Sequence, residues 1–307
     1  MAEPKPFPRE LGRYGGMAAG PLVVCIGGMH GNEPAGVFAA QRVLDELGTR
    51  RPPFRGLLLA LTGNREALLR RCRFVDEDLN RMWFPRRLRE LRRARPGNIE
   101  EAQCLELFEA IEAALAQHRG AAVFLDLHTT SAGGVPFALA ADTPLNRKLA
   151  ASIPAPLVLG LDRLLYGTLL DYVNDRGFAA VGFEGGQNEE SSSIEHNEAA
   201  LWSLLIGAGC LAQDAVARTA DSRRLLQERS AAIPKILEVH YRHGVAADDR
   251  FAMEPGFVNF QPVQHGQLLA RDRNGAITAP VDGRILLPLY QSQGSDGFFV
   301  VRELYSR

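Results

Sequence analysis

The feature that most constrains this fold is a series of short apolar runs alternating with segments of helical spacing. The runs are apolar throughout rather than at every second position, which is typical of strands buried on both faces. They occupy 21–28, 56–62, 121–130, 137–141, 156–161 and 179–186. Helical spacing is found at 34–47, from Asn98 onward and at 194–212. This alternation predicts an α/β domain in which helices flank a largely parallel or mixed sheet.

The pattern changes toward the C-terminus. From about residue 235 the segments are short, rich in β-forming residues and separated by Gly, Pro and Asn-Gly turn signals. The chain has 307 residues, more than one hydrophobic core usually supports. We therefore expect a main domain at 1–230 and a small all-β domain at 231–307.

Charge and cysteine content exclude several classes of partner. The formal net charge is -1, so no global field attracts nucleic acid or an anionic membrane. No window reaches the roughly 18 consecutive apolar residues of a membrane helix. The four cysteines are far apart and form no CxxC pair, which favours reduced thiols. The first residues are polar and proline-rich, without the apolar core of a signal peptide. We expect a cytoplasmic protein without nucleic-acid or membrane partners.

Two other clusters have simpler explanations. The arginine-rich segment 84–96 could bind RNA or an acidic partner, but it lacks interleaved aromatic residues and precedes an acidic helix. We favour a solvated helix that pairs with that neighbour. His240 and His243 have HxxH spacing, which on a strand directs them to opposite faces and argues against a shared metal.

The stretch CIGGMHGNEPAG (25–36) places His30 and Glu33 after the first apolar run, among glycines and at the start of a helix. His128 follows another apolar run, in FLDLHTT. The carboxyl ends of parallel strands meet at one edge of a sheet, where ligands bind in open α/β folds. Two imidazoles and a carboxylate form a frequent catalytic zinc set, and Asp126 could orient a ligand histidine. These residues alone fit either a metal site or an ordinary strand-to-helix turn.

Four motifs that occur in a fixed order along the chain favour the metal site. GGMHGNEPAG, RFVDEDLNRMW (73–83), FLDLHTTSAGG (124–134) and GFEGGQ (182–187) resemble the aspartoacylase and succinylglutamate desuccinylase family, relatives of the zinc carboxypeptidases. The resemblance covers roughly residues 20–200. It implies a zinc-carboxypeptidase-like fold and one Zn²⁺ per chain, bound by His30, Glu33 and His128.

The resemblance also implies a reaction, the hydrolysis of an N-acyl amide on an acidic amino acid. Glu184 would be the general acid and base, while Arg73, Asn80 and Arg81 would contact substrate. Physically, zinc makes hydroxide accessible near neutral pH and a nearby carboxylate can move the proton to the departing nitrogen. Arg73 could stabilise the oxyanion, and Arg81 could bind a carboxylate in bidentate fashion.

Two further substrate contacts are expected by the same resemblance. Arg176 is the nearest candidate for a second cation, although its spacing of eight to Glu184 departs from the family pattern and makes specificity for acetylaspartate doubtful. Tyr290 is a candidate for a tyrosine contributed by the C-terminal part. The partner would be a small N-acyl amino acid, and a homo-oligomer is possible. The alternatives are a zinc carboxypeptidase or esterase on the same scaffold and a non-catalytic metal-binding protein.

Overall fold

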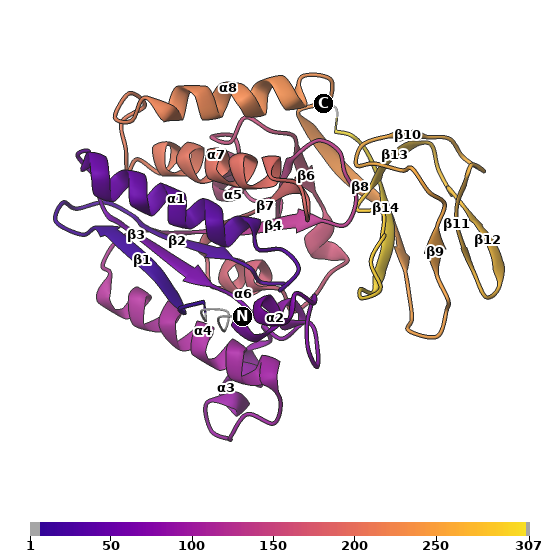
Figure 1. Ribbon diagram of the computed structural model, residues 1–307, viewed down its shortest axis with the longest axis horizontal. Coiled ribbons are helices and arrows are strands. Elements are labelled where there is room, and N and C mark those ends of the chain that lie inside the picture. The colour runs from indigo at the N-terminus through magenta and orange to yellow at the C-terminus, as the bar shows by residue number, and fades with distance from the viewer. Residues whose placement is uncertain (1–6, 305–307) are drawn as a thin grey trace, which may run out of the picture.

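A mixed sheet of eleven strands organises the computed structural model, which describes residues 7–304 (Figure 1). The strand order is β1-β3-β2-β4-β7-β5-β6-β8-β14-β13-β10, and a second sheet has the order β12-β11-β9. The strands are β1 (Glu10–Gly15), β2 (Leu22–Gly27), β3 (Leu57–Thr62), β4 (Ala122–Thr130), β5 (Phe137–Ala140), β6 (Leu157–Leu159), β7 (Ala179–Gln187), β8 (Ile236–Gly244), β9 (Ala252–Met253), β10 (Pro262–Val263), β11 (Leu268–Asp272), β12 (Gly275–Thr278), β13 (Gly283–Leu286) and β14 (Asp296–Glu303).

Helices connect most of the strands in the first part of the chain. They are α1 (Ala35–Arg50), α2 (Arg65–Arg70), α3 (Pro85–Leu91), α4 (Ile99–Gln117), α5 (Pro144–Ala150), α6 (Leu169–Asp175), α7 (Ser192–Gly207) and α8 (Arg218–Ser230), with 3-10 turns η1 (Leu79–Arg81) and η2 (Leu161–Arg163). Within the described residues, none of these helices is long and apolar enough to span a membrane.

The centre of the sheet is parallel, as predicted. Strands β3, β2, β4 and β7 pair in parallel, whereas β5 runs antiparallel to β7. All six residues of β2 are buried, because helices cover both faces of the sheet. One core lies under α1 and α7, and the other lies under α4 and α6. The predicted alternation of buried strands and helices is therefore confirmed.

Local sequence sets the start of the helices. The Asn98 side chain accepts the Glu101 N–H at 2.8 Å and caps α4 at the residue from which helical spacing begins in the sequence. The Glu101 carboxylate does not return to the Asn98 N–H; it accepts the Gly97 N–H at 2.7 Å instead. The arginine-rich segment forms the short helix α3, and Arg87 pairs with Glu77 and Glu101 on its acidic neighbours.

The sheet continues across residue 230. Strand β8 pairs in parallel with β6, and β14, β13 and β10 extend the sheet by antiparallel pairing. Only β9, β11 and β12 form a separate three-stranded sheet. The described C-terminal part is thus all-β. The domain boundary near residue 230 remains a proposal, because hydrogen bonds between β6 and β8 join the main sheet across it.

Candidate metal centre and active-site pocket

The candidate site lies at the carboxyl edge of the parallel strands. His30 follows β2, and His128 lies near the end of β4. Glu184 on β7 is the direct register partner of His128 on β4. Neighbouring residues in a parallel ladder project to the same face, so the two side chains lie side by side. This placement fulfils the topological expectation that distant motifs meet at one edge.

Close packing fixes the loop that carries His30 and Glu33. A Cβ added at Gly31 would lie 2.0 Å from the backbone carbon of Ala67, so only glycine fits beside α2. Gly28 has a φ of +71°, a conformation that glycine adopts without strain. Glycine at these two positions therefore lets the loop of His30 and Glu33 pack directly against α2.

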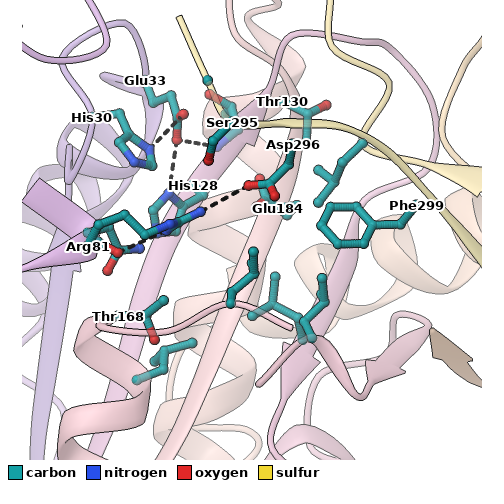
Figure 2. Close-up of a pocket in the computed structure, with 18 of the residues that line it drawn as sticks. His30, Glu33, Arg81, His128, Thr130, Thr168, Glu184, Ser295, Asp296 and Phe299 are labelled. Atoms are coloured by element: carbon teal, nitrogen blue, oxygen red, sulfur yellow. Dashed lines mark hydrogen bonds and ion pairs between the residues drawn. The ribbon is translucent and has the colours of Figure 1, made fainter. Parts of the chain in front are cut away.

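His30, Glu33 and His128 are all buried and form one cluster (Figure 2). One potential ligand atom from each lies within 4.8 Å of the others. Nδ1 of His30 is 2.9 Å from Glu33 Oε1, and Nδ1 of His128 is 3.0 Å from Glu33 Oε2. Two imidazole nitrogens and one carboxylate are a donor set that suits zinc and leaves a position open. The residues present therefore fit the metal.

A carboxylate stands behind each imidazole. The Nε2 atom of His30 is 3.2 Å from Asp78 Oδ1, and that of His128 is 2.9 Å from Asp126 Oδ2. The second contact is close but is not aligned as a hydrogen bond, so Asp126 acts on His128 mainly through its charge. Both histidines thus face Glu33 with Nδ1 and an outer carboxylate with Nε2, an arrangement that fixes ring orientation in metal sites.

The charges of the cluster shift its pKa values in opposite directions. Burial alone would lower the pKa of His128, but the carboxylates of Asp126 and Glu33 outweigh it and raise the pKa well above 6.5. Burial alone would raise the pKa of Glu33, but the imidazoles of His30 and His128 outweigh it and lower the pKa. A proton and a metal cation would therefore compete for the same imidazole nitrogen.

Glu184 is buried beside this cluster. Burial, together with the charges of Glu33 and Asp126, raises its pKa to about 8, although His128 and Arg73 oppose the shift. Its Oε2 atom is buried and has no hydrogen-bond partner among residues 7–304. A buried carboxylate oxygen without a partner is costly, which points to a proton, water or substrate at this position.

Arg73 and Asp78 tie the second motif to the metal cluster. The Arg73 guanidinium donates to Glu33 Oε1 at 3.2 Å and to Asp78 Oδ2 at 3.1 Å. Asp78 therefore bridges Arg73 and His30. These contacts bring the guanidinium next to the candidate metal ligands.

Asn80 and Arg81 also line the pocket. Asn80 is buried and its Oδ1 accepts the Leu169 N–H at 2.9 Å, which leaves its NH₂ group for other partners. Arg81 donates to Asp296 Oδ2 at 3.1 Å, a carboxylate at the start of β14 (Figure 2). Asp296 is also held by Arg242 at 2.6 Å.

The structure does not bring the other two expected contacts into the pocket. Arg176 pairs with Glu112 and Tyr172, because it precedes β7 and so lies at the opposite edge of the sheet from the site. The Tyr290 hydroxyl donates to the Glu254 carbonyl and accepts the Phe257 N–H, both in the C-terminal part. Neither residue lines the pocket.

Sequence reasoning missed three polar residues of the site. Asp78 belongs to the motif RFVDEDLNRMW, in which the expected contacts were Arg73, Asn80 and Arg81. Asp296 and Gln291 belong to PLYQSQGSDGFF, which carries no recognisable motif. Gln291 accepts a hydrogen bond from Asn32 at 2.8 Å, in the loop of the metal ligands.

The pocket that contains these groups is a cavity of about 160 Å³. The metal cluster, Glu184, Arg73 and Arg81 line one part of it, and residues from η2, α6 and the C-terminal strands line the rest. The cavity therefore joins a candidate catalytic centre to a space that could hold a small organic molecule.

The model of the succinylglutamate desuccinylase/aspartoacylase catalytic domain matches residues 19–171. The chain belongs to this family. A relative from Synechococcus sp. (strain CC9605), described as a probable aspartoacylase, is 29% identical over 259 residues, which are 81% of this chain and 76% of the relative.

Solved structures of family members share the fold. Succinylglutamate desuccinylase from Vibrio cholerae superposes with a TM-score of 0.66 at 17% identity, covering 94% of this chain and 83% of the other. The ectoine utilization protein EutE (DoeB) from Ruegeria pomeroyi superposes with a TM-score of 0.65 at 23% identity, covering 93% and 85%. At these identities the likeness establishes the fold, and membership in this hydrolase family comes from the sequence match.

Proposed function

We propose that this protein is a zinc-dependent deacylase that hydrolyses the amide bond of an N-acyl amino acid. The observation that carries the proposal is the position of Glu184, buried, partnerless at Oε2 and in register with His128 of the His-Glu-His cluster. A site that only stored a metal would not need a further buried carboxylate next to the ligands.

The candidate metal ligands and Glu184 would have different tasks in this reaction. His30, Glu33 and His128 would hold the zinc, which when bound acidifies water and polarises a carbonyl. Glu184 accepts the proton of the attacking water and returns it to the amide nitrogen as the C–N bond breaks. Its burial keeps its proton affinity high enough for both steps.

The two arginines would bind different negative groups of the substrate. Arg73 lies beside Glu33 and would donate to the oxyanion that forms at the acyl carbon, an interaction worth about 3 to 4 kcal/mol of barrier. Arg81 and the free NH₂ group of Asn80 would bind the α-carboxylate of the amino acid. To do so, the substrate carboxylate must compete with Asp296 for the Arg81 guanidinium.

The test compares the native protein with Glu184→Gln on a panel of N-acetyl and N-succinyl amino acids, with free C-terminal peptides in the same assay. Both proteins are loaded with zinc, and metal content and released amine are measured. We expect the native protein to release amino acids and the variant to lose at least about 100-fold in kcat with zinc retained. Undiminished turnover by the variant would remove Glu184 from the mechanism. Faster cleavage of peptides would assign a carboxypeptidase.

A further inference from the structure

The cavity has a second part that the proposed chemistry does not use. We call it the apolar arm, and its walls are Leu139, Leu161, Leu165, Leu170, Leu287 and Phe299. In Figure 2, Phe299 and Thr168 lie on the side of Arg81 and Glu184 away from His30 and Glu33. The arm therefore offers space, beyond Arg81 and Glu184, for the side chain of a substrate whose carboxylate reaches Arg81.

The charges around the arm are negative. Asp162 and Asp171 line the cavity with the leucines, and Asp296 lies where the arm meets Arg81. Neither Asp162 nor Asp171 forms an ion pair with any residue of 7–304. The Oδ1 atom of Asp162 is buried and has no hydrogen-bond partner in that range.

No spare cation is available for a second substrate carboxylate. Among the cavity-lining residues of the described chain, the only arginines are Arg73 and Arg81, and there is no lysine. Arg73 is held by Glu33 and Asp78, and Arg81 is the candidate for the α-carboxylate. An acidic side chain in the arm would lose its hydration and face aspartates without a counter-ion.

Given the deacylase function proposed above, we infer that the apolar arm is the side-chain subsite and selects amino acids with an aliphatic side chain that bears no carboxylate. Leucine walls favour methylene groups, and the aspartates reject a negative charge. Asp162, Asp171 and Leu165 are then residues that determine specificity, and the amino acid released is neutral or basic rather than acidic.

The decisive comparison keeps shape constant and changes charge. Zinc-loaded protein is assayed with the N-acetyl derivatives of glutamate, glutamine, norleucine and lysine. We expect kcat/KM to be about 100-fold lower for glutamate than for glutamine, because like charges in a poorly hydrated site cost several kcal/mol. A preference for norleucine or lysine over glutamate also supports the inference, and their order shows how strongly the aspartates attract a cation. Equal or faster turnover of glutamate overturns it.

Two variants locate the effect. Asp162→Asn should raise glutamate turnover relative to glutamine about tenfold, while Asp175→Asn, an exposed position on α6 outside the cavity, should not change the ratio. Leu165→Arg supplies a cation in the arm and should favour glutamate, with the exposed Leu145→Arg as its control. Unchanged ratios in both arm variants would refute the assignment.

A binding experiment separates this inference from the proposed function. The same four compounds are titrated into zinc-loaded Glu184→Gln by calorimetry. If no compound is hydrolysed by the native protein, the deacylase proposal fails, but the order of binding still decides the specificity. Tighter binding of the glutamate derivative, or binding of none, would overturn the inference.

Discussion

Replacing Asp126 by asparagine removes the negative charge behind His128 and keeps the size of the side chain. Asp126 is fully buried, and its Oδ2 atom lies 2.9 Å from Nε2 of His128. Because the opposite nitrogen of the ring faces Glu33, the carboxylate increases the basicity of the atom that would bind the metal. Its loss should weaken zinc binding about 10- to 100-fold, or about 1.4 to 2.7 kcal/mol.

The effect of Asp126→Asn on zinc affinity should depend on pH. Only the neutral imidazole binds a metal, and Asp126 holds the pKa of His128 well above 6.5. Below that pKa, zinc must displace a proton from the native protein, so affinity falls about tenfold for each pH unit. Without the Asp126 carboxylate, which raises the pKa of His128, that pKa falls and the competition weakens. The deficit of Asp126→Asn should therefore be largest at high pH and shrink as the pH is lowered.

Competition with a chromophoric chelator at pH 6.0, 7.5 and 8.5 measures the affinity, and calorimetry in two buffers of different ionisation enthalpy counts the protons released. Asp221→Asn, whose side chain is 71% exposed, is the control. We expect the variant to release fewer protons than the native protein at neutral pH. A deficit that is the same at every pH, or proton release that matches the native value, would refute the electrostatic role of Asp126.

Three further predictions follow from single contacts. Arg81→Lys should raise KM about tenfold for an N-acyl amino acid with little change in kcat, because lysine cannot form a bidentate pair with the carboxylate; steady-state kinetics checks this. Gly31→Ala should lower the free energy of unfolding by about 1 to 3 kcal/mol in denaturant titrations, since its Cβ would overlap Ala67; an unchanged midpoint would contradict the packing. Removing the metal with a chelator should lower the melting temperature reversibly, and His30→Ala should show no such response to zinc.

The elements that the sequence predicted correctly are those in which local pattern and burial agree. The uninterrupted apolar runs of β2, β4 and β7 are typical of the centre of a covered sheet, and the polar residues at or just after their carboxyl ends therefore lie at one edge. The metal cluster follows from this topology. The start of α4 at Asn98 could be predicted because the capping bond joins residues three positions apart.

The residues that the sequence could not place depend on contacts between distant segments. Asp296 pairs with Arg81 at a sequence separation of 215 residues, and Gln291 bonds to Asn32 at a separation of 259. No periodic pattern in the sequence indicates either contact. Arg176 was expected in the site because it is close to Glu184 in sequence. Closeness in sequence does not show at which end of β7 a residue lies. A position before a parallel strand lies at the edge opposite the site, and this rule alone argues against Arg176.

The C-terminal part is better understood as a wall of the active-site pocket than as an appendage. Strand β8 pairs with the three-residue strand β6, whose apolar residues would otherwise form an exposed sheet edge. Antiparallel pairing with the other side of β8 places β14 so that Asp296 reaches Arg81 and Phe299 lines the apolar arm. The first 230 residues supply the candidate metal ligands and the proposed proton-transfer group, while the later strands complete the wall of the proposed side-chain subsite. If the proposed subsite is correct, specificity depends on segments far in sequence from the four motifs that carry the family resemblance.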